Sequence, residues 1–148
     1  MSFSIKLQNP TDNTNEHKEC FGVITIDDFQ ETLVVPLEYW SKNDYQQHWK
    51  KSLERALRKE DSCLITSMYD PQKANFIVWW LLYIRENKVI VQNHLLFLNT
   101  LSESFTPDNP YRFIPKYESE NEDGDKISEW IVPIEDIEAF LAEDEKSK

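Results

Sequence analysis

The chain has 148 residues, of which 40% are hydrophobic and 13% aromatic, and its formal net charge at pH 7 is −11. This length and composition fit one globular domain with a core, and they exclude an intrinsically disordered chain and two domains of ordinary size. The negative charge disfavours binding to nucleic acid, to anionic membranes and to phosphorylated substrates.

Glycine and cysteine are both scarce. Gly22 and Gly124 are the two glycines of the chain, so neither a GxGxxG motif nor a P-loop can be formed. Cys20 and Cys63 have no CxxC spacing, which suits a reducing cytoplasm. The N-terminus has no apolar run of signal-peptide length, and the longest apolar run, residues 76–84, is too short to span a membrane. We therefore expect a soluble, cytoplasmic protein.

The first forty residues have strand chemistry. A short strand is expected at residues 3–7, followed by a polar, turn-rich N-terminal segment that ends at residue 18. Two further strands are expected at residues 20–26 and 32–37, because both are rich in apolar and β-branched residues and a turn-prone Asp-Asp pair separates them.

The pattern changes to a helical period after residue 41. Ser41 and Asp44 have the spacing of a capping box, with Asp in place of the usual Glu. We predict a helix from about Lys42 to Lys59, with a basic outer face and with His48 on the solvent side of its apolar stripe. The stripe consists of Tyr45, Trp49, Leu53, Ala56 and Leu57.

Strand chemistry then returns. Residues 63–69 form a short strand-like run, and residues 75–84 and 89–98 flank a four-residue break typical of an antiparallel hairpin. Along the first arm of this hairpin, the side chains on both alternating faces are apolar. This pattern is typical of a central strand that is covered on both faces. Residues 99–116 hold three prolines and are expected to form mostly loop.

The C-terminal part contributes one strand and one helix. Residues 127–132 are strand-like, and Pro133 is expected at the first helical position of a helix that ends near Leu141. Residues 142–148 should fray as an acidic tail. The whole chain, residues 1–148, is thus expected to be one α+β domain with about seven strands in antiparallel sheets and two main helices. The predicted core includes Trp49, Leu53, Val78, Trp80, Leu82, Val91 and Ile137.

The excess negative charge is concentrated at one end. Residues 117–148 hold twelve acidic residues against three lysines, whereas the first 116 residues hold fifteen acidic against thirteen basic residues. The resulting −9 segment produces a field that favours encounter with a basic partner. A purely solubilising role is the alternative, because many acidic tails have no other function.

None of the usual catalytic residue types forms a recognisable site. His17 lies near Cys20 in a polar segment without the spacing of a zinc site, and His48 is expected on a helix surface. His94 is expected to be a half-buried strand residue bonded to the backbone. A Cys63–His94 pair stays open, because spatial adjacency is not visible in the sequence. We expect no enzyme activity, no metal and no cofactor.

Residues 118–125 hold five acidic residues in eight positions. They do not follow the order of a calcium loop, because the D-x-D-x-D-G pattern and the Glu at the twelfth position are both missing. Carboxylates that perform acid–base chemistry need burial, and this stretch has no apolar neighbour. A solvated hairpin tip is therefore expected here.

Binding to single-stranded nucleic acid is a second possibility that the residues raise. The basic face of the first helix and the abundant aromatic residues suit it, while the net charge of −11 opposes it. A module that binds some other protein belongs to the same alternative.

Several motifs resemble one known family. The segments LVVPLEYWSKNDYQQHWKKSL, LITSMYDPQKANFIVWWLLYIRENKVIVQNHLLFL and GDKISEW are similar, in order and spacing, to the immunity proteins of bacterial contact-dependent growth inhibition systems. The resemblance covers roughly residues 25 to 141. It is strongest to the enterobacterial branch that opposes nuclease-type toxins.

This resemblance implies a Whirly-like α+β fold and a non-catalytic protein that binds the C-terminal toxin domain of a CdiA effector. The expected partner is a basic toxin domain of the nuclease type, and neither a membrane nor nucleic acid is expected to bind this protein directly. We expect the acidic loop to face the toxin, with Tyr117 as an aromatic anchor. An open sheet edge or residues 99–116 are the alternative contact surfaces. The expected contact residues are Tyr117, Glu118, Glu120, Glu122, Asp123 and Asp125.

Overall fold

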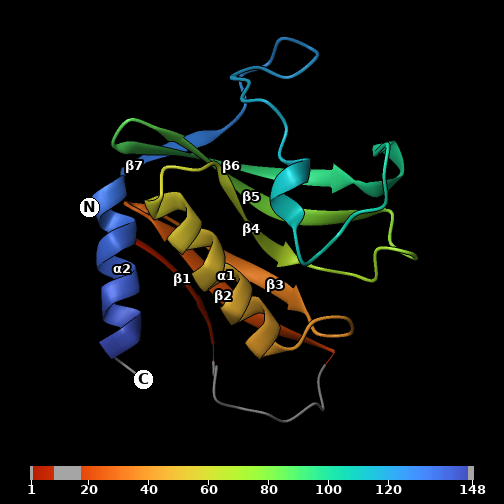
Figure 1. The fold of residues 1–148 in the computed structure, drawn as a ribbon, viewed down its shortest axis with the longest axis horizontal. Helices are drawn as coiled ribbons and strands as arrows, with labels where there is room; N and C mark the ends of the chain where they lie inside the picture. The colour runs from red at the N-terminus through yellow and green to blue at the C-terminus, as the bar shows by residue number, and fades with distance from the viewer. Residues whose placement is uncertain (1, 9–17, 147–148) are drawn as a thin grey trace.

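A computed structural model describes residues 2–8 and 18–146, which form a single α+β domain (Figure 1). Its main elements in chain order are β1 (Phe3–Leu7), β2 (Glu19–Ile26), β3 (Phe29–Pro36), α1 (Lys42–Leu57), β4 (Ser62–Ser67), β5 (Phe76–Arg85), β6 (Lys88–Phe97), β7 (Glu129–Pro133) and α2 (Ile134–Lys146). Two short 3-10 helices, η1 (Leu98–Thr100) and η2 (Pro110–Phe113), lie between β6 and β7. The predicted class, with seven strands and two main helices, is confirmed for the described part of the chain. Most of the polar N-terminal segment, including His17, lies outside it.

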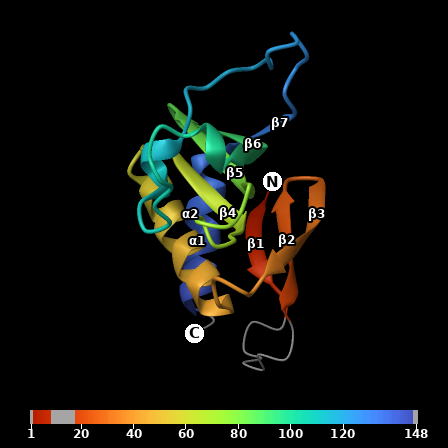
Figure 2. The same cartoon turned by 90° about the vertical axis from the view of Figure 1, so that its right-hand side faces the viewer.

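The strands form two antiparallel sheets. Sheet A has the order β1-β2-β3, and sheet B has the order β4-β5-β6-β7. Figure 2 shows both helices on one side of the molecule and sheet A on the other, with sheet B above and between them. The strand β5, which the sequence predicts to be central, lies between β4 and β6 and pairs with both along most of its length.

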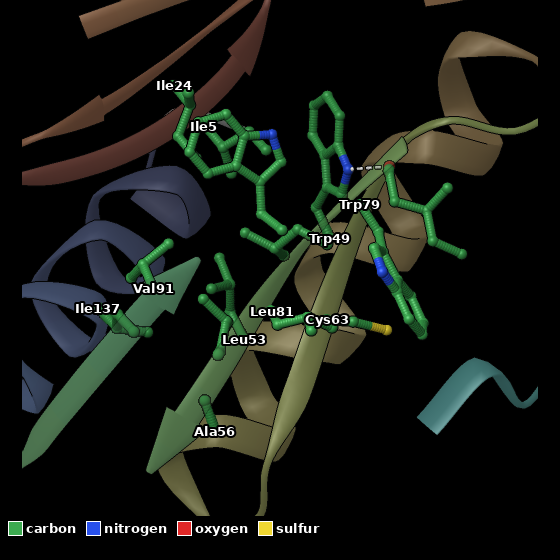
Figure 3. Close-up of a cluster of buried hydrophobic side chains, with 14 of the residues drawn as sticks. Ile5, Ile24, Trp49, Leu53, Ala56, Cys63, Trp79, Leu81, Val91 and Ile137 are labelled. Carbon is green, nitrogen blue, oxygen red and sulfur yellow. Dashed lines mark hydrogen bonds between the residues drawn. The ribbon is translucent and has the colours of Figure 1, made fainter. Parts of the chain in front are cut away.

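One hydrophobic core joins both sheets and both helices. Ile5 and Ile24 of sheet A, Leu53 of α1 and Ile137 of α2 converge in it (Figure 3). These side chains are 0–3% exposed, so they have lost nearly all contact with water. The predicted core residues that are buried are Trp49, Leu53, Trp80, Leu82, Val91 and Ile137.

The predicted burial of Val78 is wrong. Val78 is half-buried, and its neighbours on the same face of sheet B, Phe76 and Leu95, are 38% and 51% exposed. Farther along the same face of β5, Trp80 is fully buried and contacts Phe29 at the start of β3. Apolar residues occupy this face of β5 at both ends of the strand. The sequence pattern therefore does not show where the layer that covers the face ends.

Side chains of α1 cover the free edge of β4. The Nε1–H of Trp49 donates to the carbonyl of Ile65 over 2.8 Å, and the amide of Ile65 donates to Nε2 of His48 over 2.9 Å (Figure 3 shows the first bond). The hydroxyl of Ser62 donates to the carbonyl of Ser52. Backbone groups of an edge strand that would otherwise need water are thus satisfied inside the protein.

His48 is therefore not the solvent-facing residue that helical geometry predicts. It is 8% exposed, and it lies on the buried face of α1 because that face covers both the core and a strand edge. Burial lowers the pKa of His48 to about 3, and Lys51 contributes in the same direction. At neutral pH the ring is uncharged, as its role as an acceptor requires.

Most predicted element boundaries differ from the structure by one to three residues. The helix α1 begins with the predicted capping box, in which Ser41 and Asp44 each accept a backbone N–H from the other, and it ends at Leu57 before Lys59 adopts a φ of 66°. The β5–β6 turn has two residues rather than four.

Two predictions about the C-terminus are wrong. Pro133 ends β7, and α2 begins one residue later at Ile134. The helix also continues beyond Leu141 to Lys146, because this segment holds alanine, glutamate and lysine, which favour helix, and no breaker. Residues 147–148 of the predicted frayed tail lie outside the described chain.

Truncating Trp80 should test the central position of β5. Trp80 is 0% exposed and packs against Phe29 and Trp130, so Trp80→Ala is expected to lower the free energy of unfolding by about 3–5 kcal/mol. Trp80→Phe is the control. It keeps most of the ring and removes a buried Nε1–H that has no hydrogen-bond partner, so its cost should be much smaller. Urea unfolding of both variants measures the difference, and equal midpoints for Ala and wild type would contradict the assignment.

The burial of His48 predicts that acid destabilises the protein. Its pKa is about 3 in the folded state and near 6.5 when unfolded, so the unfolded state binds a proton first. The stability from neutral His48 is complete above pH 6.5 and decreases as the pH falls towards 3, by up to ~1.4 kcal/mol per pH unit. Unfolding free energies of wild type and His48→Gln from pH 7.5 to 4 should show a shallower slope for the variant. Parallel curves would contradict the assignment.

Candidate functional site

Residues 118–126, here called the acidic hairpin, project from the top of the molecule in Figure 1 between η2 and β7. Glu120 and Lys126 form an isolated antiparallel bridge, and the amide of Ile127 donates to the carbonyl of Ser119 over 2.9 Å. The predicted hairpin tip is therefore present. Five of its side chains are exposed carboxylates: Glu118, Glu120, Glu122, Asp123 and Asp125.

Asn121 shapes the tip of the acidic hairpin. Its side-chain oxygen accepts the amides of Asp123 and Asp125 over 2.9 and 3.0 Å, and its own amide donates to the carbonyl of Asp125 over 2.8 Å. Gly124 has a φ of 83°, a conformation that glycine adopts without strain. Because these bonds hold the backbone, the carboxylates around it project from a defined loop rather than from a free tail.

A polar network anchors the acidic hairpin to sheet B. The side-chain amide of Gln92, which is 1% exposed, donates to the carbonyl of Glu118 over 3.0 Å and to the carboxylate of Glu129 over 2.9 Å. The hydroxyl of Tyr117 donates to the same carboxylate over 2.9 Å. Glu129 thus receives one donor from β6 and one from the residue just before the hairpin, and such bonds to a charged acceptor are among the stronger ones.

His94 completes this network. With both N–H groups of Gln92 donated elsewhere, the Gln92 carbonyl oxygen is the acceptor, and Nε2 of His94 donates to it over 2.7 Å. Partial burial lowers the pKa of His94, which favours the uncharged ring. The predicted half-burial of His94 is confirmed, but its observed partner is a side chain rather than the backbone.

Tyr117 is half-buried at the base of the acidic hairpin. Its ring packs edge-on against Tyr83 with 5.2 Å between ring centroids, and the guanidinium of Arg85 lies 5.8 Å from the ring centre. The hydrogen bond to Glu129 raises the pKa of Tyr117. Burial raises the pKa of Tyr83 to about 12, and its hydroxyl donates to the carbonyl of Pro115. Both phenols therefore remain protonated at neutral pH and hold the hairpin to the sheet.

The chemistry of this arrangement is electrostatic. The five carboxylates are exposed to water, and no apolar wall surrounds them as in a general acid or base site. In the part of the chain that the structure describes, no cluster of three or more His, Cys, Asp or Glu residues is placed to hold a metal ion. What the hairpin does present is a dense negative charge on a fixed backbone, which attracts and orients a positively charged surface.

The other catalytic candidates have structural surroundings. Cys63 is fully buried, and burial raises the pKa of its thiol, so that it stays protonated at neutral pH. Cys20 is half-buried with its pKa raised for the same reason. His48 is occupied by the amide of Ile65, and His94 by Gln92. Nδ1 of His48 also lies 3.4 Å from the hydroxyl of Ser52, but Ser52 is 0% exposed and its hydroxyl bonds to that of Tyr111, so this pair is closed to a substrate.

Two features of the surface do not follow from the sequence reasoning. Gln92 and Glu129 belong to the candidate site because they anchor the acidic hairpin. The one sequence signal for them is that Gln92 and His94, two residues apart, interrupt an apolar strand. The second feature is a set of large apolar side chains that are exposed on the two sheets.

The sequence agrees with one family over most of its length. The model of the family described as the CdiI N-terminal domain matches residues 35–140, which are 106 of the 148 residues. The chain belongs to this family. The resemblance predicted from its motifs is confirmed.

Two relatives of the CdiI N-terminal domain family extend the comparison. A protein named immunity protein CdiI, from Enterobacter cloacae subsp. cloacae, is 42% identical over 118 residues, which are 79% of this chain and 81% of the relative. A chain in the solved CdiA-CT/CdiI toxin and immunity complex from Enterobacter cloacae has the same fold, with a TM-score of 0.82 and 36% identity. The match covers 97% of this chain and 99% of that one.

Within residues 2–8 and 18–146, no helix is both long and apolar enough to cross a membrane.

Removing the anchor should loosen the acidic hairpin. In Gln92→Leu the carbonyl of Glu118 and the carboxylate of Glu129 lose a donor, which should cost about 1–3 kcal/mol of unfolding free energy. Hydrogen exchange should accelerate at the amide of Ile127, which is bonded across the hairpin. The matched control is Gln30→Leu, an exposed position with a single side-chain bond to Thr25, for which a change within about 0.5 kcal/mol is expected. Equal exchange rates at Ile127 in both variants would show that Gln92 does not hold the hairpin.

Proposed function

We propose that this protein is an immunity protein that binds the C-terminal toxin domain of a CdiA effector and neutralises it. The observation that carries the proposal is the agreement in sequence and fold, over 97% of the chain, with a chain of the CdiA-CT/CdiI toxin and immunity complex. The relative named immunity protein CdiI supports the same role. Inhibition by binding requires no reaction at the protein itself, and the surroundings of Cys20, Cys63 and the two described histidines support a non-enzymatic role.

The charge distribution supports a basic partner. Residues 117–148 carry −9 of the total charge of −11, and the acidic hairpin displays five carboxylates on one projecting loop. A nuclease domain presents basic residues to the phosphates of its substrate. We therefore propose a toxin of the nuclease type, whose basic cleft is attracted to the acidic hairpin. The two free cysteines, Cys20 and Cys63, support action in the reducing cytoplasm of the toxin-producing cell.

The proposed contact residues are those of the acidic hairpin, with Tyr117 at its base. Glu118, Glu120 and Glu122 are exposed, and so are Asp123 and Asp125 near the tip. Since Tyr117 is half-buried against Tyr83, it presents part of its ring while its hydroxyl stays bonded to Glu129. Such a charged surface with an ordered aromatic group is a common composition for tight protein interfaces.

Co-expression tests the function directly. The CdiA C-terminal domain encoded beside this protein should stop growth when expressed alone, and this protein should restore growth. Purified toxin domain should degrade RNA or DNA, and an equimolar amount of this protein should stop the degradation. A protein that bound nucleic acid instead would shift a labelled oligonucleotide in a gel at low salt without any effect on the toxin. Growth arrest that persists in the presence of this protein would refute the proposal.

Neutralising the acidic hairpin should weaken toxin binding. A variant with Glu118, Glu120 and Glu122 changed to Gln and Asp123 and Asp125 changed to Asn should associate at least about tenfold more slowly at low salt. If the hairpin lies in the interface core, the dissociation rate should rise as well. The matched control removes five other exposed charges, at Asp27, Asp28, Glu135, Glu138 and Glu143. Surface plasmon resonance measures both rates. If both rates are unchanged in the hairpin variant, the carboxylates do not take part in toxin binding and serve only to keep the protein soluble.

A further inference from the structure

Large apolar side chains are exposed in two groups, one on each sheet. In sheet A, Phe21 on β2 pairs with Val34 on β3, and they are 47% and 51% exposed. In sheet B, Phe76 on β5 pairs with Phe97 on β6, and they are 38% and 49% exposed, with 6.0 Å between ring centroids. We call these four residues, together with Leu95, the apolar band.

Ser67 connects the two halves of the apolar band. Its hydroxyl donates to the carbonyl of Val34 over 3.2 Å, so the end of β4 lies against β3. Ser67 also pairs with Val78, and Val78 pairs with Leu95, which is 51% exposed. The paired positions from β2 to β6 therefore hold no charged residue, and the buried Ser67 and half-buried Val78 lie between the two exposed groups.

A pocket lies at the Phe76 end of the apolar band. It has a volume of about 540 Å³, and its walls include Tyr39, Tyr69 and Phe76, which are 38–43% exposed. The carboxylates of Glu38 and Asp70 also line it, as does Lys73. The amide of Gln72 donates to the Asp70 carboxylate, which holds this side chain in a turn. Aromatic faces beside carboxylates attract a guanidinium or ammonium group through cation–π contact and ion pairing.

We propose that the apolar band and this pocket form the surface that holds the toxin domain, with a cationic side chain of the toxin in the pocket. This inference rests on the proposed function and adds the location of the short-range contact. Groups of large exposed apolar side chains mark interaction surfaces in soluble proteins. The occupant is a basic protein rather than a second copy of this chain, because two copies would each bring a net charge of −11 to the contact.

The acidic hairpin and the apolar band then have different effects on binding. Exposed carboxylates on the hairpin act over a distance of about one Debye length, about 8 Å at physiological salt, and raise the association rate. Apolar and aromatic groups act only in contact, where removal of water from both partners sets the dissociation rate. Kinetic measurements therefore separate the two surfaces.

The test is a double variant, Phe76→Thr with Phe97→Thr, which keeps strand-forming residues at two exposed positions. Its complex with the cognate CdiA C-terminal domain should dissociate at least about tenfold faster, with an association rate within about twofold of wild type. The matched control is Ile131→Thr on β7, which is 55% exposed and lies off the apolar band, and it should dissociate like wild type.

Two further measurements keep the inference testable if the double variant is unstable. Glu38→Lys should weaken toxin binding at least about tenfold more than Asp28→Lys, a charge reversal in the β2–β3 turn. In wild-type protein, amide exchange at the pocket-lining positions of one segment should slow when the toxin domain is added, at Tyr69, Asp70, Lys73, Ala74 and Asn75.

The outcomes separate this inference from the proposed function. If wild type does not bind the toxin domain, the proposed function is wrong. If wild type binds and the double variant dissociates like the Ile131→Thr control, the function stands and the apolar band is not the contact. Sedimentation that shows a wild-type dimer, lost in the double variant while toxin affinity is unchanged, would assign the band to self-association and overturn the inference.

Discussion

The contact between α1 and the edge of β4 holds the two sheets in one fold. Tyr45 contributes most directly, because its hydroxyl donates to the carbonyl of Pro36 at the end of β3 and accepts the amide of Met68 just after β4. One buried side chain thus bonds to the backbone of both sheets. His48 and Trp49 add the two bonds to Ile65, so both backbone groups of this edge residue are satisfied without water or another strand.

This contact also explains which parts of the fold could be predicted. The helical spacing of Tyr45, Trp49 and Leu53 and the two apolar faces of β5 are local patterns, and they located these elements correctly. The burial of His48 does not follow from its helical position, because it depends on the edge of a strand that lies seventeen residues away in the chain. Val78 was missed for the same kind of reason, since the layer that would cover it comes from a distant part of the sequence and stops short of it.

The candidate site shows the same limit. Composition alone identified the acidic stretch, and the glycine and asparagine within it are consistent with a tight turn. Its attachment depends on Gln92, which lies 26 residues before Glu118 and 37 before Glu129, and on packing of Tyr117 against Tyr83. No periodic pattern links positions so far apart, so a charged stretch and an ordered charged loop look the same in the sequence.

The distribution of charge and apolar surface suggests how one small domain can bind quickly and tightly. Carboxylates of the acidic hairpin remain in water, so they create a field without the cost of removing ions from solvent. Phe76, Leu95 and Phe97 lie on a sheet face that is rigid because the opposite positions of β5 are buried in the core. Exposed side chains on such a rigid face lose little conformational freedom on binding, and more of their burial is then available as affinity. Because the field and the apolar face belong to different elements, a change in one leaves the other intact.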